Sequence, residues 1–281
     1  MTAPLQYFPL IRGRQWDLLA LSDLLQQGQL SPRIVPIIEP VKDSSALAKV
    51  LRAATVAQHP LFVIANASVG DYGLLAEPRY PLVWNEWVQP ARWFDPLDAP
   101  LVLAQTKTQA ALLAPEQRAV VPNAARVRAL AHPRAIYLED HTPGRQRTED
   151  YASIPDEFYQ YQHAALPGIG FADYPLSRAT YDPHGYPQRA IALHLLYPGK
   201  NGTLWMHHFV SQSNDGFDAP GEKFFEAAAT MQDWLATHPE AITPGTTAIS
   251  EALAARHFPG LGAVRKWQLS HFLTIMGRWL T

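Results

Sequence analysis

Short apolar runs of strand length alternate with longer stretches of helical periodicity along the first half of the chain. The run at residues 7–12, for example, is followed at 18–25 by leucines spaced as on one face of a helix. More runs of strand length follow before residue 140, at 34–39, 61–66, 100–105, 119–122 and 135–139. This alternation is typical of parallel βαβ construction, because two parallel strands need a crossover connection. The runs are almost continuously apolar, which predicts strands that are buried on both faces.

The rhythm changes after residue 140, and we expect the closing part of the fold to be irregular. Residues 168–173 form a further strand-length run, and the runs at 189–197 and 203–211 flank a Pro-Gly-Lys-Asn-Gly turn. Such a turn between two strands predicts a β-hairpin, which is antiparallel. The sequence therefore predicts an α/β fold, a (β/α)8 TIM-barrel-like domain whose irregular closing part contains a β-hairpin.

The remaining segments have less regular patterns. The aromatic-rich segment 84–94 has partly helical spacing, a short helix is expected near 156–162, and longer helical patterns cover 222–235 and 264–280. A chain of 281 residues suits one large barrel or two smaller domains, and neither a repeat nor a linker divides it. We predict a single barrel domain over residues 1–281, with 246–281 as a C-terminal helical extension packed on it.

Composition excludes several classes of protein and site. The chain has no cysteine, which excludes disulfides, thiolate zinc sites and a cysteine nucleophile. Its formal net charge of -2 offers no basic excess, so we do not expect a nucleic-acid partner. No apolar run approaches the ~20 residues that span a bilayer, and the first residues show no signal-peptide pattern. We therefore expect a cytoplasmic protein that does not contact a membrane.

Polar residues end most of the predicted strands, at the edge where a barrel carries its site. Arg12 ends the first strand, Gln15 lies in the turn behind it, and Asn66, Gln105 and Glu139 end three others. We predict these five residues as ligand-binding. A guanidinium at the first strand end could receive a phosphate or a carboxylate, which indicates a small anionic ligand.

Carboxylates are prominent among these strand ends. Glu39 and Asp173 each end a predicted strand, and Glu139 with Asp140 ends another. Converging carboxylates could hold a divalent cation such as Mg²⁺ or Mn²⁺, or crowding could raise one pKa and create an acid/base pair. We predict Glu39 and Asp173 as catalytic residues, and the metal stays unknown. Alternatively, each carboxylate caps a helix or pairs with a cation, as Glu39 could with Arg12.

Three histidines occur in the predicted hairpin. His207 and His208 follow each other, so only one of them can face the interior. His194 lies on the partner strand, where a cross-strand pair could supply metal ligands or a general base. We predict His207 as catalytic, and His194 and His208 as ligand-binding. The structural alternative is a hydrogen-bonded core histidine beside an exposed one.

Four stretches of the chain carry a family resemblance: YFPLIRGRQ at 7–15, PIIEP at 36–40, GFADY at 170–174 and HHFVS at 207–211. Their order and spacing resemble the phage "beta protein" family and its bacterial relatives, over about residues 6–275. The resemblance implies a barrel-type protein in a phage-related or phage-defence-associated setting. It brings no catalytic residues with it.

The leading hypothesis is a barrel protein that binds a small anionic ligand at the carboxyl ends of its strands. The second is a metal-assisted hydrolase or phosphodiesterase, with Glu39, Glu139, Asp173 and the histidines around one ion. The third is a non-enzymatic adaptor whose aromatic residues and last helix bind a partner protein, or a second copy of the chain in a homo-oligomer. No Walker, dinucleotide-binding, H-E-x-x-H or G-x-S-x-G motif occurs, so the sequence leaves open whether the protein is an enzyme.

Overall fold

The computed structural model describes residues 5–95, 97–141, 144–145, 147–160, 168–183 and 188–281. These residues divide into two compact units. Unit 1 takes its residues from 1–141 and 163–181 with Leu280, and unit 2 from 142–162 and 182–279 with Thr281. Nearly all of the predicted C-terminal extension, 246–281, thus belongs to unit 2. That residues 1–281 form a single barrel domain stays a prediction.

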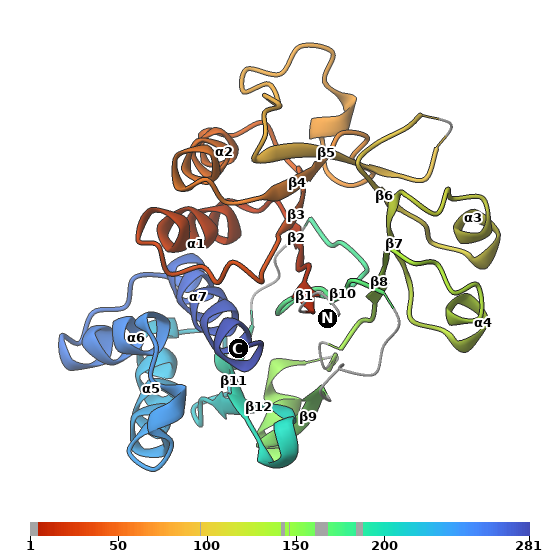
Figure 1. Cartoon of the computed structure of the whole chain (residues 1–281). Coiled ribbons are helices and arrows are strands. Elements are labelled where there is room, and N and C mark those ends of the chain that lie inside the picture. The colour runs from red at the N-terminus through yellow and green to blue at the C-terminus, as the bar shows by residue number, and fades with distance from the viewer. Residues whose placement is uncertain (1–4, 96, 142–143, 146, 161–167, 184–187) are drawn as a thin grey trace. The chain divides into compact units, whose positions relative to one another are not determined.

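Unit 1 is built on one sheet of nine strands that pair in parallel, in the order β1-β10-β8-β7-β6-β5-β4-β3-β2. Figure 1 shows this sheet curling round, with helices on its outer side. The strands are β1 (Gln6–Tyr7), β2 (Leu10–Arg12), β3 (Ile37–Glu39), β4 (Leu61–Ile64), β5 (Val88–Trp93), β6 (Leu101–Leu103), β7 (Arg118–Pro122), β8 (Ala135–Leu138) and β10 (Gly170–Ala172).

The strands at the two ends of this order, β1 and β2, are separated in sequence by Phe8 and Pro9 alone. Pro9 has no N–H to donate, which accounts for the interruption. The N–H of Phe8 donates to the carbonyl of Phe171 at 2.8 Å, and the N–H of Ile37 donates to the carbonyl of Pro9 at 2.9 Å. The segment 6–12 therefore bonds to β10 on one side and to β3 on the other.

Helices of unequal length follow the strands of unit 1. α1 (Gln15–Gln26) and α2 (Ser45–Ala57) pack against each other, and the Ser44 side chain caps α2 by accepting from the N–H of Leu47. α3 (Lys107–Ala111) and α4 (Ala125–Arg128) are about one turn long, and η1 (Tyr72–Leu74) is a 3₁₀ turn. The predicted α/β fold is thus confirmed as a curled parallel sheet flanked by helices, but its units do not repeat as a regular eightfold barrel.

Strand β5 lies in the segment 84–94, whose partly helical spacing did not predict a strand. Residues Val88–Trp93 pair in parallel with β4 and β6. Their side chains are only partly buried at four of the six positions, so the run is neither continuously apolar nor cleanly alternating. Pro90 within the run also argues against a strand when only the sequence is considered.

Unit 2 contains a separate three-stranded antiparallel sheet, in the order β11-β12-β9. The predicted hairpin forms between β11 (Ala192–Pro198) and β12 (Leu204–Val210), with the 3₁₀ turn η3 (Lys200–Gly202) at its tip. Its other neighbour is β9 (Asp156–Gln160), where a helix was predicted. The hairpin therefore does not close the parallel sheet, because it pairs with β9 instead.

Helices α5 (Pro220–Leu235), α6 (Pro244–Ala254) and α7 (Leu261–Trp279) complete unit 2, with the 3₁₀ turns η2 (Thr148–Ser153) and η4 (Pro239–Ala241). Apolar side chains of β11 and of these helices form one core, which includes Leu193, Leu195, Phe224 and Met231. Within the described ranges, no helix combines the length and the apolar character that crossing a membrane requires.

Candidate functional site

The polar strand ends of unit 1 fall on two faces of the curled sheet. Leu10 and Ile37 pack in the core that the sheet surrounds, and we call the face that bears them the inner face. Side chains alternate between faces along a strand, so Arg12 and Glu39, two residues further on, lie on the inner face as well. Asp173 follows an inner-face alanine and lies on the opposite, outer face. The predicted carboxylates therefore do not share one cluster.

Glu39 is the centre of the inner-face cluster and is fully buried. One of its carboxylate oxygens, Oε1, accepts from the backbone N–H and the hydroxyl of Ser68 at 2.8 and 3.0 Å, and from the indole Nε1–H of Trp93 at 2.8 Å. The other oxygen, Oε2, is ion-paired with Arg12. These contacts match the structural alternative of an Arg12–Glu39 pair, and a catalytic role for Glu39 stays a prediction.

Arg12 lies on the inner face with 5% of its surface exposed. Its two terminal nitrogens donate to Glu39 and, at 2.6 Å, to the carbonyl of Ala179, while the guanidinium stacks 5.2 Å from the ring centre of Tyr174. Burial lowers the pKa of Arg12. The Nε–H of Arg12 is buried and has no hydrogen-bond acceptor among the residues described. A buried N–H in that state is costly, and an acceptor atom from a ligand would satisfy it.

The outer-face cluster contains Asp173, which is fully buried and accepts a hydrogen bond from the Tyr7 hydroxyl. Nearby, the carboxylate of Glu139 lies 2.5 Å from Nε2 of His141 and accepts from the Asn123 amide at 2.5 Å. Asp140 takes a different role, because it accepts the backbone N–H of Ala179 at 3.0 Å. The Glu139–His141 contact is suited to exchanging a proton.

His141 was not predicted from the sequence, although it belongs to this cluster. Burial alone would lower the pKa of His141, but the hydrogen bond to Glu139 and the charges of Asp173, Glu139 and Asp140 outweigh burial and raise it. The signal that could have found it is the Glu-Asp-His sequence at the end of β8, since residues that follow a strand end also reach the carboxyl edge of the sheet.

Three predicted ligand-binding residues lie outside both clusters. The side-chain amide of Asn66 is used in hydrogen bonds within the fold, since it donates to the Trp93 carbonyl at 2.9 Å and to Asp95 at 3.0 Å. Gln105 is exposed at the start of the α3 capping box, and Gln15 is the exposed first residue of α1. The structure thus assigns Asn66 a role in joining β4 to β5 and places neither glutamine in the Arg12 or the Glu139 cluster.

The three hairpin histidines belong to the antiparallel sheet of unit 2 and not to the parallel sheet of unit 1, whose carboxylates they were predicted to join. His194 pairs with His208 in the strand register, and their Nδ1 atoms are 2.7 Å apart. Nε2 of His208 lies 3.2 Å from Glu157, and the ring of Tyr151 contacts both imidazoles. Burial lowers the pKa of His194 to about 4 and that of His208 to about 3. Both rings are therefore neutral at pH 7.

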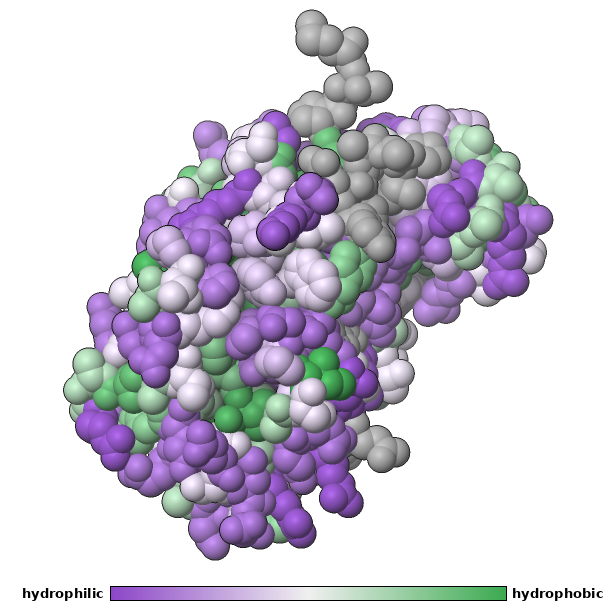
Figure 2. Space-filling model, turned by 90° about the horizontal axis from the view of Figure 1, so that it is seen from below, coloured by the Kyte–Doolittle hydropathy of each residue, from purple (hydrophilic) through white to green (hydrophobic). Residues whose placement is uncertain are grey.

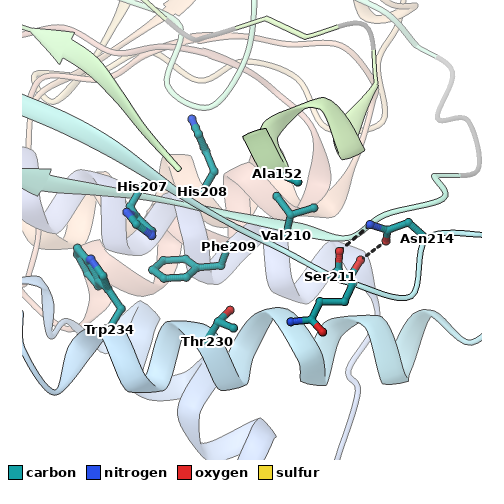
Figure 3. A pocket seen from close by; sticks show the side chains of 10 residues that line it. Ala152, His207, His208, Phe209, Val210, Ser211, Asn214, Thr230 and Trp234 are labelled. Atoms are coloured by element: carbon teal, nitrogen blue, oxygen red, sulfur yellow. Dashed lines mark hydrogen bonds between the residues drawn. The ribbon is translucent and has the colours of Figure 1, made fainter. Parts of the chain in front are cut away.

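His207 lies on the other face of β12, directly opposite Leu195 in the register. Its Nδ1 lies 2.6 Å from the Asp156 carboxylate, which also accepts the hydroxyl of Tyr197 at 2.9 Å. The ring stacks on Trp234 with centres 5.1 Å apart. His207 lines a cavity of about 670 Å³. In Figure 3 its imidazole lies beside Trp234, while the side chain of His208 leaves the strand on the opposite side.

No group of three or more His, Asp or Glu side chains in the described part of the chain is arranged to hold a metal ion. The interpretation of the strand-end carboxylates as ligands of one divalent cation therefore has no such group to support it among the described residues, and the metal stays unknown. Comparisons with family models, with curated proteins and with solved structures found no match to this chain. The resemblance to phage beta proteins stays a prediction.

Proposed function

We propose that unit 1 binds a small anionic ligand at the carboxyl ends of its parallel strands, on the inner face. The observation that carries this proposal is the buried Nε–H of Arg12, which has no acceptor among the described residues. A guanidinium held by a carboxylate, a carbonyl and an aromatic ring presents its remaining N–H in a fixed direction. A carboxylate or phosphate oxygen forms a strong, charge-assisted hydrogen bond with such a donor.

Position within the fold supports the same proposal. In open and closed parallel α/β sheets, ligands bind at the carboxyl ends of the strands, because the loops there converge. Arg12 and Glu39, on the inner face at this edge, are 5% and 0% exposed. Charged side chains are seldom buried so deeply without a structural or functional reason, and such groups cluster at functional sites. We propose that the curled sheet, like a TIM barrel, binds its ligand at the carboxyl ends of its strands.

The rival hypotheses have less support from the described residues. A metal-assisted hydrolase needs converging ligands, whereas Glu39 is ion-paired with Arg12 and Asp173 lies on the other face. An adaptor needs a continuous apolar surface. Large apolar residues such as Val56, Leu74 and Leu112 are exposed on different elements, and Figure 2 shows hydrophobic patches separated by hydrophilic residues on the face in view. The phage-related setting is proposed on the resemblance alone.

Thermal unfolding with inorganic phosphate, citrate and adenosine monophosphate tests the proposal. A ligand that binds only the folded state raises Tm. We expect at least one of these anions to do so in the wild-type protein. Arg12→Lys keeps a cation beside Glu39 but removes the Nε–H, and should weaken the anion's binding roughly tenfold. Arg52→Lys, at an exposed position of α2, is the matched control and should leave binding unchanged.

Each variant is compared with its own ligand-free Tm, so that a change in stability is not mistaken for a change in binding. The proposal is contradicted if none of the three anions raises Tm. It is contradicted equally if the increase in Tm is as large in Arg12→Lys as in the wild-type protein.

A further inference from the structure

Unit 2 contains a histidine whose ring is oriented on three sides. Nδ1 of His207 lies 2.6 Å from Asp156, Trp234 stacks on the ring at 5.1 Å, and the Phe209 ring centre is 4.4 Å away. The hydroxyl of Tyr197 holds the carboxylate by donating to the same Asp156 oxygen at 2.9 Å. The dyad of His207 and Asp156, together with Tyr197, thus takes one residue from each of the three strands of the antiparallel sheet.

The carboxylate decides which nitrogen of His207 carries the hydrogen. An ionised Asp156 only accepts hydrogen bonds, so a neutral imidazole places its hydrogen on Nδ1 and leaves a lone pair on Nε2. Nε2 makes no hydrogen bond within the described part of the chain. The side chain is 15% exposed and lines the cavity of about 670 Å³. His207 therefore offers an acceptor whose tautomer is fixed in advance.

The cavity around His207 has a neutral lining. Ser211, Gln212, Asn214 and Thr230 contribute polar side chains, and Trp234 and Phe209 contribute aromatic ones. Among the residues that the structure describes, no Asp, Glu, Lys or Arg lines it. Its volume lies within the range of about 300–1,000 Å³ that is usual for small-molecule sites. A charged ligand would find no counter-ion among these lining residues, whereas a neutral hydroxylated ligand needs none.

We propose that this cavity binds a small neutral hydroxylated molecule of the polyol or sugar class, through a hydroxyl group that donates to Nε2 of His207. The site lies in unit 2 and is independent of the anion site proposed for unit 1. The amide of Gln212 and the hydroxyl of Thr230 provide further hydrogen-bonding groups, and the aromatic residues contact the C–H groups of the ligand.

Nitrogen-15 NMR of the full chain labelled on histidine tests the proposal, with glucose, ribose and glycerol as neutral probes and glucose 6-phosphate as the charged counterpart. We expect His207 to carry its hydrogen on Nδ1 without any probe. At least one neutral probe should shift the Nε2 signal of His207 and the indole N–H signal of Trp234 until saturation. Glucose 6-phosphate should bind more weakly than glucose.

Variants then separate the dyad from the cavity that surrounds it. His207→Gln and Asp156→Asn should each weaken binding of the neutral probe roughly tenfold, because one hydrogen bond is lost. The indole N–H signal of Trp234 reports the binding in each variant. Asparagine can donate to Nδ1, so Asp156→Asn also permits the other tautomer. His257→Gln, at an exposed position in unit 2, is the control and should bind as the wild-type protein does.

Four results would overturn the proposal. Two of them concern the unmodified protein alone or with neutral probes: a hydrogen on Nε2 of His207 without any probe, or no response to any of the three neutral probes. The other two concern comparisons: tighter binding of glucose 6-phosphate than of glucose, or undiminished binding of the neutral probe in His207→Gln. The first of these readouts needs no variant, so the proposal remains testable even where a substitution prevents folding.

Discussion

Nδ1 of His194 and Nδ1 of His208 lie 2.7 Å apart across the β11–β12 pair. One ring must donate and the other accept, so the contact requires that at least one of the two rings is neutral. Glu157 fixes the far side of His208, at 3.2 Å from Nε2. The pair is therefore a structural element of unit 2 that depends on pH.

The first prediction concerns this pH dependence. Burial lowers the pKa of His194 to about 4 and that of His208 to about 3, from the ordinary histidine value of 6.5. Below about pH 6.5 these histidines bind protons in the unfolded chain but not in the folded one. The free energy of unfolding therefore falls as the pH is lowered from about 6.5 to the pKa values of the folded state. Each unit of pKa difference corresponds to about 1.4 kcal/mol.

Urea unfolding at pH 7 and pH 5, followed by tryptophan fluorescence, measures this effect. We expect lower stability at pH 5 in the wild-type protein, and a smaller difference between the two pH values in His208→Gln. An equal difference in both proteins would show that the histidine pair does not cause it.

A second prediction compares a buried ion pair with an exposed one. Removing Glu39 leaves Arg12 charged and buried, so Glu39→Ala should lower the free energy of unfolding by about 3–5 kcal/mol. Lys49 and Asp23 form a pair at 3.8 Å with 46% and 35% of their side chains exposed. Lys49→Ala should change stability by about 1 kcal/mol or less. Similar losses in the two variants, measured by urea unfolding, would contradict the inner-face cluster.

A third prediction concerns two glycines that each follow a proline in the first turn of a helix. A Cβ on Gly245 of α6 would collide with the Trp267 carbonyl oxygen and lie 2.8 Å from the His271 nitrogen. A Cβ on Gly221 of α5 would meet nothing closer than 3.4 Å.

Gly245→Ala should therefore destabilise unit 2 by about 1–3 kcal/mol, because α6 and α7 must move apart. Gly221→Ala should be neutral, or stabilise by up to about 1 kcal/mol through helix propensity. Thermal unfolding of both variants checks the difference. An equal change in Tm in the two variants would mean that α6 and α7 are not in close contact at Gly245.

A fourth prediction tests the outer-face cluster. The hydrogen bond and the charge of Glu139 help to raise the pKa of His141 against the effect of burial. Glu139→Gln removes that charge and should lower the pKa of His141, as measured by NMR titration of the imidazole. Glu116→Gln, at an exposed position outside this cluster, is the control. An unchanged pKa in Glu139→Gln would show that other groups set it.

Local patterns identified most elements of unit 1, because an apolar run of strand length or a helical face is a property of adjacent residues. The strand-length run 34–39, in which β3 forms, illustrates this. β5 was missed, since its side chains are partly buried at most positions and Pro90 interrupts it. The hairpin at 192–210 was found, but the sequence does not show which sheet a hairpin joins.

The site was predictable to the extent that strand ends reveal it. Arg12 and Glu39 lie together on the inner face, as their positions indicated. Asp173 lies on the other face because side chains alternate, and a shift of one residue in the expected strand end reverses that assignment. The contact between Asp156 and His207 joins residues 51 positions apart in sequence, and no local pattern predicts such a contact.

Nitrogen-15 NMR of the arginine side chains tests most directly whether the inner face of unit 1 binds an anion. The Nε–H signal of Arg12 can be assigned by its loss in Arg12→Lys. We predict that phosphate, citrate or adenosine monophosphate shifts this signal until saturation, while the signal of Arg52 stays in place. An Arg12 signal that none of these anions moves would contradict the proposed function.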